Sequence, residues 1–222
     1  MRVFKKIFAE SPAVVRVAPF LVFLALTICQ GQFGAASAYW FYLAKTIVGV
    51  WLIWEMRPFV SEMRWAISWE AIAVGILIFA IWVGLDSFYP HPMKNNSAWN
   101  PNLQFGENSM LAWFFVATRI LGSTFVVPPL EEVFYRSFLY RYIANQNFLS
   151  VPLNKFLPLP FFATALIFGL SHNEWLAGII CGAAFQWLVI RKNRLGDAMT
   201  AHAVTNFLLG VWIAWKHDWH FW

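Results

Sequence analysis

Two adjacent glutamates, Glu131 and Glu132, lie within an almost continuously apolar part of the chain. A carboxylate at hydrocarbon depth is costly, so such residues are rare and usually functional. Arg136 follows Glu132 by four residues, on the same helical face and in the acid-before-base order that favours an ion pair. Glu131 points about 100° away. We therefore predict that Arg136 neutralises Glu132 and leaves Glu131 free for chemistry, the alternative being two solvated carboxylates at a helix start.

Three further polar side chains fall in or beside apolar segments. His172 closes one segment, and histidine readily serves as a base or a ligand. His202 and Asn206 are four residues apart in Asp197–Trp215, so they share a face and need partners when buried. The alternatives are an interfacial histidine and an interhelical hydrogen-bond pair. Ser171 precedes His172, but adjacent helical residues do not face each other, so no serine–histidine dyad is expected.

Two cations also fall at membrane depth. Lys45 and Arg119 both lie inside apolar segments. We expect them to pair with acids such as Glu55 or Glu70, or to extend along apolar surface until the charge reaches water.

The composition indicates what must hold these groups in place. The 222 residues are 60% hydrophobic and only 12% charged, against about 25% charged in soluble domains. This excludes an ordinary soluble globule and predicts one polytopic membrane domain over residues 1–222. Cys29 and Cys181 lie in apolar runs, which argues against a disulfide framework. The net charge of +5 comes from basic residues at segment ends, as in membrane proteins, so no nucleic-acid partner is expected.

The apolar pattern predicts an all-α bundle of about eight helical segments with the polar groups inside it. The segments are Val14–Ile28, Tyr39–Met56, Ala66–Phe88, Met110–Val127, Leu130–Ala144, Leu157–Leu170, Trp175–Ile190 and Asp197–Trp215. Pro128 and Pro129 are expected to end the fourth segment and start the fifth. That would place both glutamates in a first turn, where the helix dipole favours negative charge.

The basic residues predict the orientation. Arg2, Lys5 and Lys6 put the N-terminus in the cytoplasm. The cluster between positions 191 and 194 is also cytoplasmic if the helix carrying the glutamates crosses only in part. We therefore expect seven full spans and one interrupted helix, within a range of seven to eight transmembrane segments, and an external C-terminus.

Taken in order, the polar groups form three motifs. They are Glu131-Glu132-x-x-x-Arg136, Phe168-x-x-x-His172 and His202-x-x-x-Asn206. This set resembles the type II CAAX prenyl endopeptidases, also called the CPBP or ABI family of intramembrane proteases. Every motif position matches, and the resemblance covers about residues 118–215. The compact length resembles the bacterial branch that accompanies exosortase sorting, which implies a bacterial inner membrane.

The resemblance implies hydrolysis of a peptide bond in a membrane-associated peptide or protein. Glu131 would be the general base that activates a water molecule, and His172 would hold that water. His202 and Asn206 would stabilise the oxyanion. The predicted ion pair beside Glu131 would shape the site.

The resemblance leaves the cofactor open. Glu131, His172 and His202 could hold a catalytic zinc with one open position. The His-Glu-x-x-His signature is absent from the sequence, so we expect no obligatory metal.

Other function classes use similar residues. A transporter or proton pathway would need the same buried ionisable groups, although no inverted repeat is visible. A haem- or quinone-binding protein would use His172 and His202 as ligands. A scaffold that binds peptides without cleaving them would keep only part of the motif set. The three ordered motifs favour the protease.

Overall fold

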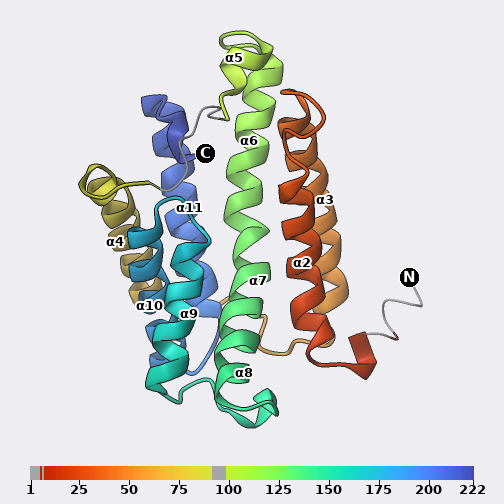
Figure 1. Cartoon of the computed structure of the whole chain (residues 1–222), viewed down its shortest axis with the longest axis vertical. Helices are drawn as coiled ribbons and strands as arrows, with labels where there is room; N and C mark the ends of the chain where they lie inside the picture. Colours follow the sequence, from red (N-terminus) through yellow and green to blue (C-terminus); the bar gives the residue numbers. More distant parts are fainter. Residues whose placement is uncertain (1–5, 7, 92–98) are drawn as a thin grey trace.

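The computed structural model describes residue 6, residues 8–91 and residues 99–222. All regular elements in these residues are helices (Figure 1). The main helices are α2 (Val14–Ile28), α3 (Ser37–Met56), α4 (Trp69–Leu85), α5 (Pro101–Phe105), α6 (Met110–Phe125), α7 (Val127–Glu132), the π-helix η2 (Val133–Leu139), α8 (Tyr140–Ala144), α9 (Pro158–Leu170), α10 (Trp175–Lys192) and α11 (Gly196–Lys216). Short 3-10 turns are η1 (Asp86–Phe88), η3 (Phe148–Ser150) and η4 (Trp219–Phe221). The predicted all-helical fold is confirmed.

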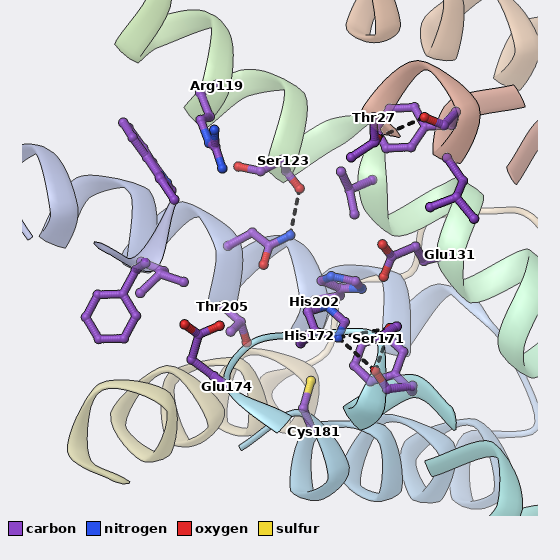
Figure 2. Close-up of a pocket in the computed structure, with 18 of the residues that line it drawn as sticks. Thr27, Arg119, Ser123, Glu131, Ser171, His172, Glu174, Cys181, His202 and Thr205 are labelled. Atoms are coloured by element: carbon purple, nitrogen blue, oxygen red, sulfur yellow. Dashed lines mark hydrogen bonds between the residues drawn. The ribbon is translucent and has the colours of Figure 1, made fainter. Parts of the chain in front are cut away.

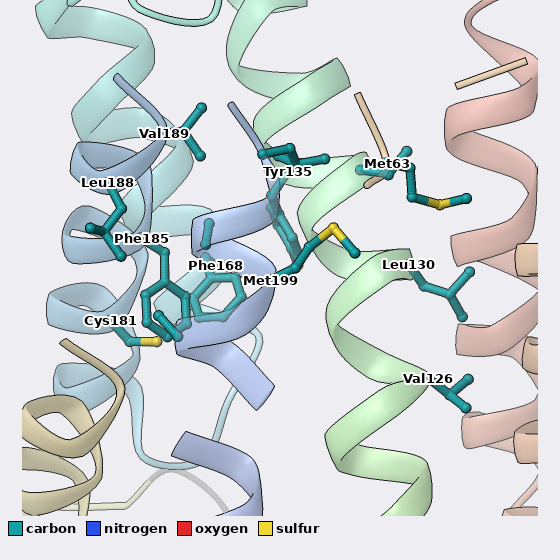
Figure 3. Close-up of a cluster of buried hydrophobic side chains, with 14 of the residues drawn as sticks. Met63, Val126, Leu130, Tyr135, Phe168, Cys181, Phe185, Leu188, Val189 and Met199 are labelled. Atoms are coloured by element: carbon teal, nitrogen blue, oxygen red, sulfur yellow. The ribbon is translucent and has the colours of Figure 1, made fainter. Parts of the chain in front are cut away.

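The helices run up and down beside one central column. Figure 1 shows α6, α7 and α8 in line, with α2 and α3 on one side and α4, α9, α10 and α11 on the other. The closest packing joins α9 to α10, α4 to α11, α6 to α11 and α2 to α3. The main core lies between these layers and includes Leu130, Phe168, Phe185 and Met199 (Figure 3).

The central column corrects one prediction. Met110–Ala144 is a single helical run of 35 residues, so the expected fourth and fifth segments are one helix. Proline removes a hydrogen-bond donor, yet surrounding packing keeps the chain helical through Pro128 and Pro129 with only a turn at Val126. The prolines do begin α7 in its first turn, as predicted, but the expected separation into two helical segments is wrong.

The same correction applies to the surroundings of the glutamates. Neither Glu131 nor Glu132 lies in the first turn of α7. The predicted help from a helix N-terminus is therefore wrong, because the dipole acts only within the first turn. The charges must be stabilised by side chains instead.

Within the described part of the chain, three helices are long and apolar enough to cross a membrane: Trp69–Phe88, Met110–Ala144 and Gly196–Lys216. Val14–Ile28 and Pro158–Leu170 are shorter apolar helices. These helices, together with outward-facing large apolar side chains such as Trp54 and Trp69, indicate a membrane protein. The number of spans stays a prediction.

The single helical run Met110–Ala144 changes how the predicted orientation is reached. Seven successive crossings would leave the basic residues at positions 57–64 and 191–194 at the end of the bundle where α2 begins (Figure 1). No partial crossing is then needed to satisfy the loop-charge rule. Arg2 and Lys5, on which the orientation partly depends, lie outside the described residues.

Close helix packing fixes the helices that carry the histidines. A Cβ at Gly178 would lie 2.9 Å from the Gly169 Cα, between α10 and α9. A Cβ at Gly75 would lie 2.6 Å from the Ala201 carbonyl oxygen, between α4 and α11. Small residues let membrane helices approach this closely. The residue after Ala201 is His202, so this contact sets the depth and rotation of that side chain.

Candidate active site

The bundle encloses a cavity of about 400 Å³. Side chains from α2, α3, α4, α6, α7, α9, α10 and α11 line it, so it lies inside the bundle (Figure 2). The four residues predicted to carry the chemistry all line it: Glu131, His172, His202 and Asn206. Residues that are up to 75 positions apart in sequence thus meet in one space.

Glu131 projects from α7 into this cavity. Figure 2 shows its carboxylate directed toward the region that holds the imidazoles of His202 and His172. Its Oε2 atom is buried and has no hydrogen-bond partner among the residues that the structure describes. A buried oxygen without a partner retains its capacity to accept a proton or a hydrogen bond from a water or a substrate.

Glu132 has a different environment. Its side chain is fully buried, and its Oε2 lies 3.1 Å from the Arg136 Nε, so the predicted i,i+4 pairing is confirmed. Its Oε1 lies 2.9 Å from the Nδ1 of His202. An ionised carboxylate only accepts hydrogen bonds, so His202 donates its Nδ1–H. The Nε2 atom of His202 is then available to a ligand in the cavity.

Arg136 is fixed from several sides. Its guanidinium lies 4.4 Å from the centroid of the Phe168 ring and donates to the Gly182 carbonyl oxygen at 3.4 Å. The α7, α9 and α10 helices therefore meet at this one charge. Because Arg136 and His202 hold the two oxygens of Glu132, the carboxylate has a defined position beside Glu131.

His172 lies in the turn after α9, not in the helix. Its Nδ1 is 2.8 Å from the Phe168 carbonyl oxygen, so Nδ1–H donates and the neutral ring has its lone pair on Nε2. The Trp82 ring meets it edge-on at 5.5 Å. These contacts orient the imidazole toward the cavity.

Ser171 contacts His172, contrary to the prediction for adjacent helical residues. Its Oγ lies 3.2 Å from the histidine Nδ1, because α9 ends at Leu170 and the chain turns. Both Ser171 Oγ and His172 Nδ1 are held by the Phe168 carbonyl oxygen. A nitrogen that already donates a proton to a carbonyl oxygen cannot take one from the serine, so the conclusion that there is no dyad is unchanged.

Asn206 lies one turn after His202 on α11. Its Nδ2 donates to the Ser123 carbonyl oxygen at 2.8 Å, linking α11 to α6. A primary amide has a second N–H, which remains for a ligand. His202 and Asn206 therefore form a row of two potential donors along one face of the cavity.

The cavity also contains charged residues that the motifs did not assign to the site. Glu174 is 6% exposed and lies just before α10, and burial raises its pKa. No periodicity or spacing distinguishes it in the sequence. Lys45 and Arg119 also line the cavity. The predicted pairing of these cations with Glu55 or Glu70 is wrong, since Glu70 pairs with Lys192 at 2.7 Å and, among the described residues, neither cation forms an ion pair with a glutamate.

Residues 112–208 match the family described as Rce1-like, type II CAAX prenyl endopeptidase Rce1-like. This confirms the family resemblance. The matched region holds all three motifs and the helices α6 to α11 that carry them. It indicates a peptidase of the membrane. Comparison with curated proteins and with solved structures gave no match.

The Rce1-like region also contains an element that the sequence did not predict. The π-helix η2 follows Glu132 directly and carries Tyr135 and Arg136. Wider helical turns of this kind are rare and frequently occur at functional sites. The Tyr135 hydroxyl lies 3.4 Å from Ser171 Oγ, so η2 also contacts the turn that holds His172.

A metal was the alternative use of the same residues. Within the part of the chain that the structure describes, no three His, Cys, Asp or Glu side chains are grouped to hold a metal ion. Glu131, His172 and His202 therefore do not fit a three-ligand zinc site as arranged.

Proposed function

We propose that this Rce1-like chain is an intramembrane endopeptidase in which Glu131 is the general base. The observation that carries the proposal is the contrast between two adjacent acids. Glu132 is held by Arg136 and His202, whereas Glu131 presents an unpartnered buried oxygen in the cavity. A general base must be ordered and yet available to the proton that it abstracts.

The first step places a water molecule between Glu131 and His172. The His172 Nε2 lone pair accepts one hydrogen of this water, because Nδ1–H is held by the backbone. Glu131 removes the other hydrogen while the water oxygen forms a bond to the carbonyl carbon of the substrate.

The carbonyl oxygen then becomes an oxyanion that needs donors. His202 donates through Nε2–H when it is an imidazolium, a form that the Glu132 carboxylate stabilises at 2.9 Å. Asn206 contributes its second amide N–H. Removal of one such donor typically costs about 3–4 kcal/mol of transition-state stabilisation.

The final step breaks the peptide C–N bond. The electron pair of that bond goes to nitrogen, and Glu131 delivers the proton that it took from water. The products are a carboxylic acid and an amine, and Glu131 returns to the carboxylate form.

The substrate class in this proposal is a membrane-associated peptide or protein. Aromatic and aliphatic side chains such as Phe20, Phe23 and Leu24 line the cavity beside the polar groups, which suits an apolar peptide. We further propose a bacterial inner membrane, a cytoplasmic N-terminus and a role beside an exosortase-type sorting system. The proposal includes no obligatory metal. Protein that has been treated with a chelator, and that elemental analysis shows to be metal-free, should therefore keep full activity.

Substrate trapping tests the proposal. Glu131→Gln keeps the size of the side chain and removes the base, so this variant should bind its substrate without cleaving it. Mass spectrometry of what co-purifies identifies the bound peptide, and wild-type protein should then cleave it at one bond. A substrate that the wild type binds but never cleaves would contradict the proposal. Proton flux in sealed vesicles without proteolysis would favour a proton pathway instead.

A further inference from the structure

The active-site cavity contains two cations that the reaction above does not use. Lys45 projects from α3 and is 6% exposed. Its Nζ donates to Thr27 Oγ1 at 3.0 Å and lies 4.7 Å and 4.4 Å from the ring centroids of Phe23 and Tyr42. Its nearest partners are thus one hydroxyl and two aromatic faces.

Arg119 projects from α6 into the same cavity (Figure 2). Its guanidinium lies 5.0 Å, 4.6 Å and 5.2 Å from the ring centroids of Tyr42, Trp99 and Trp222. Among the described residues, none receives a hydrogen bond from this guanidinium, although it has five N–H donors. Its charge is therefore held by aromatic rings, with its hydrogen-bonding capacity unused.

The buried arginines of the described bundle, unlike the partly exposed Arg119, each have a carboxylate partner. Arg16 and Arg141 each pair with Glu62 at 2.8 Å and 2.9 Å, and Arg136 pairs with Glu132 at 3.1 Å. A buried charge without a partner is destabilising by several kcal/mol, and cation–π contacts offset only about 2 kcal/mol of this. Within the described residues, no carboxylate forms an ion pair with Lys45 or Arg119, and the acidic charge that acts on Lys45 is that of Glu131 in the same cavity. The two cations are therefore free to bind an anionic ligand.

The position of the two cations defines where that ligand lies. They flank one ring, Tyr42, so they form a single charged wall. Arg119 and Glu131 are on the same helical run, twelve residues apart, which corresponds to about 18 Å along the axis. An extended peptide covers at most about 3.6 Å per residue. An anion at this wall would therefore be a few residues from a bond placed at Glu131.

We propose that Lys45 and Arg119 form a subsite for a carboxylate of the peptide substrate, a few residues from the bond that Glu131 hydrolyses. The inference rests on the proposed function. Arginine binds carboxylates through two parallel hydrogen bonds, and lysine adds a second charge. The carboxylate comes from an acidic side chain or from the C-terminus of the peptide.

The test uses full-length protein in lipid nanodiscs and apolar peptides of matched sequence. One arm compares a C-terminal carboxylate with a C-terminal amide. The other compares Asp and Glu with Asn and Gln at each position. We expect kcat/KM to be at least about tenfold higher for the carboxylate in one arm, since a charge-assisted pair is about twice as strong as a neutral hydrogen bond. Lys45→Met and Arg119→Met should each bring that ratio close to one.

A matched variant controls for the loss of a positive charge. Lys216→Met removes a cation that also lies over aromatic rings, 5.6 Å and 4.1 Å from the Trp212 and Trp215 centroids, but does not line the cavity. It should keep the full preference for the carboxylate. Equal rates for all peptides, or a preference that survives Arg119→Met, would overturn the subsite. Either result is compatible with cleavage that depends on Glu131, so neither of them would contradict the proposed reaction.

Binding gives a second readout that does not need catalysis. Fluorescence anisotropy of the same peptides on the Glu131→Gln protein should show at least about tenfold tighter binding of the carboxylate form. Adding Arg119→Met should abolish the difference. If short-chain phosphatidylglycerol instead displaces acid and amide forms alike, the cations bind a lipid phosphate and the inference is wrong.

Discussion

Two neighbouring glutamates in one helix have opposite surroundings. Glu132 is enclosed, with Arg136 on one oxygen and His202 on the other. Glu131 lies about 100° further round the helix and has a buried oxygen without a partner. Helix rotation places Arg136 beside Glu132 and not beside Glu131, which begins the difference between the two acids.

Glu132→Gln tests the supporting role. The change keeps the shape but leaves Arg136 buried without a counter-charge, which typically costs about 3–5 kcal/mol of folding free energy. It also removes the carboxylate that stabilises the His202 imidazolium, so activity should fall about 10²–10³-fold. Thermal unfolding in detergent and a peptide cleavage assay measure the two effects.

A double variant separates the two effects. Glu132→Gln with Arg136→Met removes both charges, so the unfolding temperature should recover while activity stays low. Glu55→Gln is a matched control, because Glu55 is a buried acid on α3 that does not line the cavity. It should have little effect on activity. Recovery of activity in the double variant would show that Glu132 only balances the charge of Arg136.

The sequence predicts the local part of this network but not the long-range part. The four-residue spacing of Glu132 and Arg136 gives their contact directly. The bond from Glu132 to His202 joins residues 70 positions apart, and only the packing of α11 against the central column creates it. Glu174 reaches the cavity through a turn that has no periodicity to reveal it.

At the scale of the elements, the helix ends and the helix contacts position the site. The α2 boundaries, Val14–Ile28, agree with the apolar run in the sequence. The break expected at Pro128 and Pro129 does not occur, because tertiary packing maintains the helix where local preference would end it. The π-helix that follows had no signal in the residues. A π-helix such as η2 depends on the positions that neighbouring side chains take up in the folded bundle.

Gly75→Ala tests whether the contact between α4 and α11 sets the position of His202. The new methyl group would lie 2.6 Å from the Ala201 oxygen and 2.7 Å from the Val204 Cβ, so the helices must separate. We expect a loss of roughly 1–3 kcal/mol in unfolding free energy and a lower kcat. Gly84→Ala, on the same helix, meets no atom within 4 Å and should be neutral or slightly stabilising. Equal effects of the two changes would show that the contact between α4 and α11 does not set the position of His202.

At the scale of the whole molecule, one charge cluster joins three parts of the chain. Glu62, between α3 and α4, binds Arg16 of α2 at 2.8 Å and Arg141 of α8 at 2.9 Å. Burial alone would raise the pKa of Glu62. The Arg16 charge and the hydrogen bonds from Ser137 and Arg16 outweigh it and lower the pKa to about 2. The cluster therefore ties one end of the bundle together through an ionised carboxylate.

This cluster predicts an acid-sensitive stability. A folded-state pKa below the ordinary 4.5 means that the stabilisation is complete above about pH 4.5 and is lost as pH falls toward 2. The depressed pKa corresponds to roughly 3 kcal/mol. The unfolding temperature should therefore drop between pH 4.5 and 2, and less so in Glu62→Gln. Glu10→Gln changes only an exposed pair with Lys6 and should follow the wild-type profile. A wild-type profile in Glu62→Gln would contradict the role of the cluster.

The most direct test of the account is the rate at which the trapped substrate is hydrolysed by wild-type protein and by Glu131→Gln, both in lipid nanodiscs. No described residue bonds to the buried Oε2 of Glu131, so the variant should unfold at nearly the wild-type temperature. The account predicts that its kcat falls by about 10²–10⁴-fold, the usual contribution of a general base. Hydrolysis by the folded Glu131→Gln protein at the wild-type rate would contradict it.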